Sequence, residues 1–218
     1  MVSPVRKAGR YRQVVDGLVL PVSVTDQPAL DFCNTLAGWD EHEPREYLTS
    51  YAHLALWARE AGLVDAPSTQ NVLALAEEHP QAADQQLDRA LALRAALYAS
   101  CTTRSATAAL GSVAAEARAA ASHAVLTTDA PPGRRWSIDE TAGLARPVLE
   151  IAREAGDLLA TTELAQVRAC PGSDCGWLFL DRSGRRRWCT MEVCGNRAKA
   201  RRHAARARSA EGDAKGGA

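Results

Sequence analysis

The chain has 218 residues, of which 46% are hydrophobic, so it can bury one core and carry a small additional module. No apolar run reaches the roughly 18 residues that cross a bilayer, and the N-terminus lacks the apolar segment of a secretory signal. Composition therefore argues against a membrane or secreted protein, and we expect a cytoplasmic one.

Positive charge is concentrated near the C-terminus, although the whole chain has a net charge of zero. Residues 168–208 contain 11 Lys and Arg against three acidic residues, a net charge of +8, which leaves −8 for the remainder. This asymmetry predicts a polyanion-binding module on an acidic body. The alternative is that the basic module docks against that body.

The N-terminal third predicts a hairpin followed by a short helix. Residues 1–10 are basic and irregular, and we expect them to be flexible. Residues 13–20 place an Asp16-Gly17 turn between β-branched runs, which indicates a β-hairpin. Pro28 lies near the first helical position of a short helix over residues 29–36.

The middle of the chain predicts long helices, because Ala, Leu and Arg are abundant and aromatic residues are scarce. Apolar residues follow helical spacing over 46–61, 84–101 and 144–162, and an Ala-rich run extends the second of these to about residue 123.

Residues 125–128 and 134–138 fit two strands around a Pro/Gly loop. A competing interpretation is that Ser137 and Glu140 form a capping box that opens a helix.

Cys170, Cys175, Cys189 and Cys194 form two pairs with four residues within each pair and thirteen between them. Zn²⁺ favours four such ligands in a tetrahedron, and two short loops supply them at little entropic cost. Two disulfides are the alternative, but a cytosolic chain with this pattern more often binds metal. Four cysteines leave no open coordination position, so we expect a structural zinc ion that does not activate water.

Residues 177–180 and 185–188 flank a turn-like segment and predict a hairpin between the cysteine pairs. A basic helix is expected from Gly195 to about Arg208, followed by a flexible tail over 209–218. Knuckle, hairpin and helix is the order of a treble-clef finger.

Arginine offers bidentate donors to phosphate and guanine, and intervening alanines let a helix approach a groove, so DNA is the expected partner. The predicted contacts lie on the hairpin and the helix: Arg182, Arg185, Arg186, Arg187, Arg197, Lys199, Arg201, Arg202 and Arg206.

Two segments of the chain resemble known protein families. The cysteine segments, including Cys194-Gly195-Asn196-Arg197, closely resemble the CGNR zinc finger family. Residues 30–36, with Trp57 and 61–63 downstream, are similar to the ABATE domain that usually precedes this finger. The family is described as stress-induced transcriptional regulators, so the resemblance implies a regulator.

We therefore expect an α+β fold: a predominantly helical body at 11–163 with one or two short β-hairpins, and a treble-clef-like zinc finger at 164–208. The expected function is a nucleoid-associated, DNA-binding transcription regulator whose body senses a signal or forms a homodimer. RNA or ribosome binding, and a protein-protein adaptor with a purely structural finger, are the alternatives.

Asp31, Asn34 and Thr35 share one helical face and could line an effector pocket, or else be buried groups that fix a loop or pack the finger. The five histidines lack ligand spacing, and Cys33 and Cys101 fit small apolar core residues. No nucleotide-binding loop, nucleophile elbow or zinc-protease motif is present, so we do not expect an enzyme.

Overall fold

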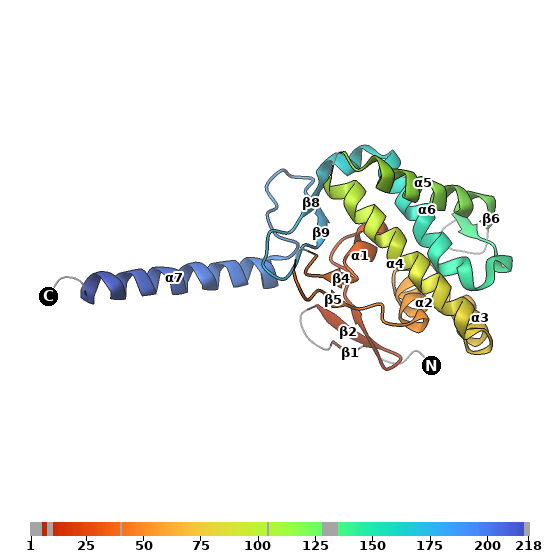
Figure 1. Ribbon diagram of the computed structural model, residues 1–218, viewed down its shortest axis with the longest axis horizontal. Helices are drawn as coiled ribbons and strands as arrows, with labels where there is room; N and C mark the ends of the chain where they lie inside the picture. Colours follow the sequence, from red (N-terminus) through yellow and green to blue (C-terminus); the bar gives the residue numbers. More distant parts are fainter. Residues whose placement is uncertain (1–5, 8–10, 40, 104, 128–134, 216–218) are drawn as a thin grey trace.

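The computed structural model describes residues 6–7, 11–39, 41–103, 105–127 and 135–215 (Figure 1). Its helices are α1 (Pro28–Cys33), α2 (Tyr51–Glu60), α3 (Ala66–Glu78), α4 (Pro80–Thr102), α5 (Thr107–Ser122), α6 (Arg146–Ala160) and α7 (Asn196–Lys215). Short helical turns are η1 (Glu140–Ala145), η2 (Thr162–Gln166) and η3 (Met191–Gly195).

The described strands are short and form small antiparallel sheets. A three-stranded sheet contains β1 (Arg6–Lys7), β2 (Arg12–Val15) and β3 (Leu18–Pro21). Three two-stranded sheets pair β4 (Leu36–Ala37) with β5 (Arg45–Glu46), β6 (Ala124–Thr127) with β7 (Arg135–Ile138), and β8 (Val167–Ala169) with β9 (Leu178–Leu180). The predicted α+β class with a mostly helical body is confirmed.

Helix α6 lies at the centre of the body, against α1, α4 and α5 (Figure 1). Its apolar side chains at helical spacing, such as Val148, Ile151 and Leu158, are fully buried. Gly156 allows a close approach to α5, since a Cβ there would lie 2.9 Å from the Cβ of Ala117. The helical pattern predicted for 144–162 is therefore confirmed as a core helix.

The predicted N-terminal hairpin is present, and the predicted helix over 29–36 is present but ends at Cys33, because Leu36 belongs to β4. Val15 and Leu18 flank an Asp16-Gly17 turn in which both residues have positive φ (48° and 84°), as a tight hairpin turn requires. Helix α1 begins at Pro28, is capped by the side chain of Gln27, and is largely buried.

Helix α2 begins at Tyr51, five residues later than expected. Ser50 caps it by accepting a bond from the backbone N–H of His53, and Glu46 belongs instead to β5. Helix α3 was not predicted. Helix α7 continues to Lys215, past the expected end at Arg208.

Strands β6 and β7 pair antiparallel from Ala124 opposite Ile138, which confirms the two-strand interpretation; the loop at 128–134 lies outside the described residues. The capping-box alternative is wrong, because Ser137 lies in β7 and its hydroxyl donates to Glu150. Asp139 caps the following turn. In the described part of the chain, no helix has the length and apolar character to cross a membrane.

Candidate metal centre and nucleic-acid interface

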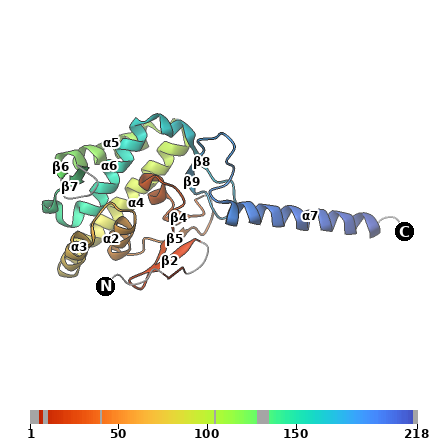
Figure 2. The ribbon, with the colours of Figure 1, turned by 180° about the vertical axis from the view of Figure 1, so that it is seen from behind.

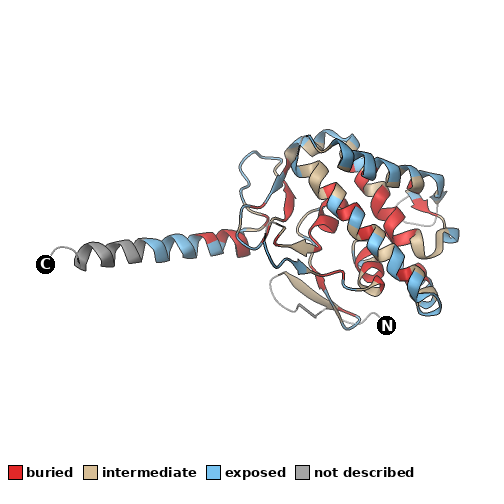
Figure 3. Ribbon diagram, viewed as in Figure 1, coloured by how far each residue is buried: buried red, intermediate tan, exposed pale blue. Residues whose placement is uncertain are grey.

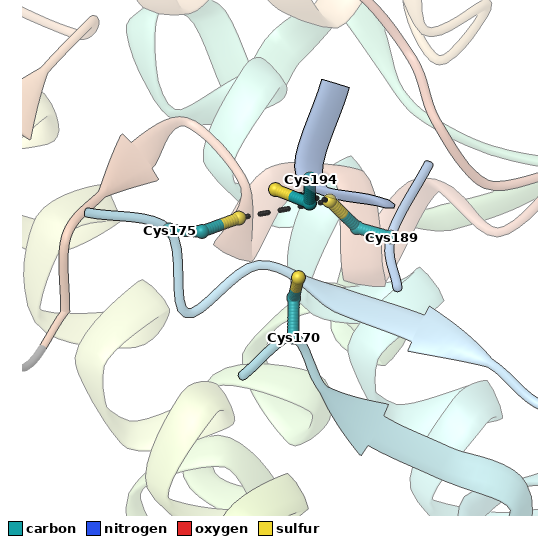
Figure 4. Close-up of side chains that lie close together, drawn as sticks. All are labelled: Cys170, Cys175, Cys189 and Cys194. Atoms are coloured by element: carbon teal, nitrogen blue, oxygen red, sulfur yellow. Dashed lines mark hydrogen bonds between the residues drawn. The ribbon is translucent and has the colours of Figure 1, made fainter. Parts of the chain in front are cut away.

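Four cysteine side chains converge at the base of α7 (Figure 4). Cys170 and Cys175 flank the turn between β8 and β9, Cys189 lies in the loop after β9, and Cys194 lies in η3. Their sulfur atoms all lie within 4.8 Å of one another, and all four residues are buried. The structure therefore brings together all four predicted zinc ligands.

The sulfur spacing fits zinc. Zn–S bonds of about 2.3 Å in a tetrahedron separate the sulfurs by about 3.8 Å. The Sγ atoms of Cys175 and Cys189 lie 3.6 Å apart, and those of Cys189 and Cys194 lie 3.7 Å apart. None of the six cysteines forms a disulfide, so the disulfide alternative is wrong. The cluster can hold a structural zinc ion, which would tie the two cysteine segments together.

The turn between Cys170 and Cys175 is shaped to admit the sulfurs. A Cβ at Gly172 would lie 3.0 Å from the Sγ of Cys194, so a larger residue would crowd the cluster. Gly176 has a φ of 68°, in the left-handed region that favours glycine. These glycines explain locally why the sequence folds into a tight knuckle.

Hydrogen bonds with Cys175 and then Cys189 lower the pKa of the Cys170 thiol to about 7. Hydrogen bonds with Cys170 and the other thiols of the cluster lower the pKa of Cys194 and raise the pKa of Cys175 and Cys189, so the thiolate, which is the form that binds metal, is favoured at Cys170 and Cys194. Beside the cluster, burial and a bond to Cys194 raise the pKa of Tyr11, so its hydroxyl stays protonated and can donate to sulfur.

The finger hairpin differs from the predicted one. Strand β9 pairs with β8 across the first cysteine pair, and the segment 185–188 is not a strand. Asp181 Oδ1 accepts the backbone N–H of Arg186, and the Ser183 hydroxyl accepts that of Arg185. These bonds bend the chain into a loop, which local strand propensity did not reveal.

The finger is joined to the body by buried hydrogen bonds. The Asn34 carboxamide donates to the carbonyl of Leu178 (3.0 Å) and accepts from its N–H (2.7 Å), at 1% exposure of Asn34. Further bonds run from Trp177 Nε1 to the Leu36 carbonyl (3.0 Å), from Gly38 N–H to the Cys175 carbonyl (2.8 Å) and from the Tyr98 hydroxyl to the Gly176 carbonyl (2.9 Å).

Asp31, Asn34 and Thr35 do not share a pocket. Asp31 accepts bonds from the Ser23 hydroxyl and from two backbone N–H groups of the 23–25 loop. Thr35 accepts a bond from Arg94, and Asn34 holds the finger. These hydrogen bonds fit the interpretation in which the three residues fix a loop and pack the finger, but Asp31 also borders a hollow of about 260 Å³, so the effector-pocket interpretation stays a prediction.

Two of the predicted DNA-contacting arginines are engaged within the protein. Arg182 pairs with Asp26 and Glu163, each at 2.9 Å. Arg186 lies over the Phe179 ring at 4.8 Å, and its guanidinium donates to backbone carbonyl groups that include that of Cys189. Arg186 therefore packs the finger.

Six of the remaining predicted basic residues are exposed: Arg185, Arg187, Arg197, Lys199, Arg201 and Arg202. Arg187 lies over the Trp188 ring at 5.2 Å, and Arg201 donates to the Ser173 hydroxyl at 2.7 Å. The Arg206 side chain lies outside the described part of the structure. Four side chains have neither a hydrogen bond nor an ion pair to any described residue: Arg185, Arg197, Lys199 and Arg202.

Sequence patterns missed two residues that complete this region. Tyr11, directly before β2, contacts the cysteines, and Arg94, 4% exposed on α4, pairs with Glu46. Both contacts join residues far apart in the sequence, and neither follows a recognisable spacing. The sequence shows a tyrosine and an arginine at these positions, but it does not identify their partners.

Comparison with protein families identifies two regions of the chain. The model of the CGNR zinc finger matches residues 166–207, and the ABATE model, described as "Putative stress-induced transcription regulator", matches residues 26–162. Neither description is that of an enzyme. A comparison with curated proteins found no match. Since the ABATE match alone spans more than half of the 218 residues, the chain belongs to the ABATE family and carries a CGNR zinc finger after its ABATE domain.

Proposed function

We propose that the protein is a DNA-binding transcription regulator in which a structural zinc ion fixes the helix that contacts DNA. The observation that carries this proposal is the position of α7, which projects away from the body (Figures 1 and 2). The description of the family as transcription regulators supports it.

Helix α7 is anchored only at its base in the described structure. Ala198, in the first turn, is 8% exposed, whereas residues 196, 197 and 199–205 are exposed, and Figure 3 shows this stretch largely in pale blue. An Ala- and Arg-rich helix without an apolar face gains little from packing, so it needs a fixed base and a partner. Duplex DNA is such a partner, because its phosphates neutralise the positive charge.

The surroundings of α7 favour one face for DNA. Arg201 contacts the knuckle through Ser173. Arg197 borders a hollow of about 440 Å³ in which three carboxylates, those of Glu41, Glu43 and Asp174, outnumber the one other arginine, Arg45. Carboxylates repel phosphate, so DNA should approach the other row of basic residues. By helical spacing, that row contains Lys199, Arg202 and Arg206.

Fluorescence anisotropy of the full-length, zinc-loaded protein with labelled duplex DNA, over a series of salt concentrations, tests the proposal. The logarithm of the binding constant should fall with the logarithm of salt concentration, by about 0.9 per neutralised phosphate. Arg202→Ala should weaken binding and reduce this slope by about one. Arg118→Ala removes a charge that is also exposed, from α5, and should change neither quantity.

A flat salt response, or no DNA binding at low salt, would refute the proposal. If Arg202→Ala and the unaltered protein had the same salt dependence of the binding constant, we would conclude that α7 does not contact the DNA. Preference for structured RNA in direct competition would reassign the partner to RNA.

A second candidate is a protein-protein adaptor with a purely structural finger, and the pairing of Arg182 with Asp26 and Glu163 favours it. Such an adaptor would bind neither duplex DNA nor RNA.

For the body we propose signal sensing or homodimerisation, with domain boundaries at 11–163 and 164–208. A DNA-bound regulator would be cytoplasmic and associated with the nucleoid.

A further inference from the structure

Tyr11 lies beside the cysteine cluster although it is far away in the sequence. Its hydroxyl donates to the Sγ of Cys194 at 3.5 Å and lies 3.6 Å from the Sγ of Cys189. Its ring packs against that of Trp177, with centroids 4.7 Å apart. Tyr11 precedes both regions matched by the family models, which begin at residues 26 and 166.

Both the backbone and the hydroxyl of Tyr11 are held by hydrogen bonds. The backbone N–H of Val22 donates to the Tyr11 carbonyl at 3.0 Å, which fixes the chain beside β3. The Tyr11 hydroxyl lies 2.8 Å from the Oγ1 of Thr190. If Thr190 donates to the tyrosine oxygen, the tyrosine proton is directed to the sulfur of Cys194. The hydroxyl is therefore oriented to donate to a sulfur atom that would bind the metal, as groups that support metal ligands commonly are.

Four thiolates and one Zn²⁺ carry a net charge of −2, and here the cysteines are 0–5% exposed. A buried charge is costly unless hydrogen bonds compensate for its lost hydration. We propose that Tyr11 donates a hydrogen bond to the zinc-bound thiolates, so that the residue directly before β2 is part of the metal site. The proposal depends on zinc binding and is independent of any nucleic acid.

Zinc affinity of the full-length protein, measured by competition with a chromogenic chelator, provides the test. Tyr11→Phe keeps the ring and its packing on Trp177 but removes the donor, and it should weaken zinc binding by about tenfold or more. Tyr47→Phe is the matched control. Tyr47 is 5% exposed in the same apolar cluster, and its hydroxyl has no bond to sulfur in the described structure.

Replacing zinc by cobalt gives a second measurement, the absorption spectrum of the metal site, which a change in packing alone would not shift. Loss of a hydrogen bond raises the energy of the sulfur lone pairs, so the thiolate-to-cobalt charge-transfer band of Tyr11→Phe should move to lower energy. Weaker zinc binding with this band shift, in Tyr11→Phe alone, supports the proposal. Unchanged affinity and spectrum in Tyr11→Phe, or equal losses in both variants, would overturn it.

Discussion

Replacement of Asn34 by alanine tests whether the finger and the body form one folded unit. The carboxamide makes two hydrogen bonds to the backbone of Leu178, at 2.7 and 3.0 Å, and both residues are at most 1% exposed. Asn34→Ala would leave a buried N–H and a buried carbonyl without partners. Each such group costs about 1–3 kcal/mol, so the variant should lose about 2–6 kcal/mol of unfolding free energy.

Urea unfolding of the zinc-loaded proteins, followed by circular dichroism and by tryptophan fluorescence, measures this loss. Trp177 in the finger and Trp57 in the body both contribute to the fluorescence, so fluorescence follows unfolding of both parts. If the finger and the body unfold together, circular dichroism and fluorescence should show one shared transition. Asn71→Ala, at an exposed position on α3, is the control and should be nearly neutral. A loss below about 1 kcal/mol for Asn34→Ala, or two separate transitions in the unaltered protein, would refute the reasoning.

Two further predictions concern the ionisable residue Asp31 and the contrast between a buried and an exposed arginine. Burial raises the pKa of Asp31, so the folded state holds this proton more tightly than the unfolded chain, and the protein should lose stability as pH rises from 3.8 through the raised value. Asp31→Asn lacks this titration, so its stability relative to the unaltered protein should improve over that interval; parallel pH profiles in urea unfolding would contradict this. Arg94→Leu should cost about 3 kcal/mol, the low end for a broken buried pair, because Glu46 is 30% exposed. Arg182→Ala should leave the melting temperature nearly unchanged, because its ion pairs are exposed, and similar losses in both variants would contradict the distinction.

The sequence was most informative where local chemistry decides the structure. The Asp16-Gly17 turn required a hairpin, and the cysteine spacing indicated the cluster. Helix α3 escaped detection because it buries only Ser68, Thr69 and Val72, which form no apolar stripe. Its start was nevertheless marked by the capping residue Asp65.

Contacts between distant segments could not be predicted. The finger strand β9 pairs with β8 because the knuckle from Cys170 to Cys175 reverses the chain, whereas local propensity favoured a strand after residue 184. The basic residues were recognised as a group, but only the structure separates Arg182 and Arg186, which have partners within the protein, from exposed residues such as Arg202. That division depends on loop geometry, which composition does not encode.

DNA binding by the same protein with and without zinc tests most directly whether the metal positions α7. Anisotropy titrations at low salt would compare zinc-loaded protein, protein stripped by a chelator under reducing conditions, and stripped protein after zinc is restored. We predict salt-sensitive binding by the loaded protein, at least a tenfold loss of affinity on stripping, and recovery with zinc. Equal affinity of the loaded and stripped proteins would contradict the account, because α7 would then not need the metal to bind DNA.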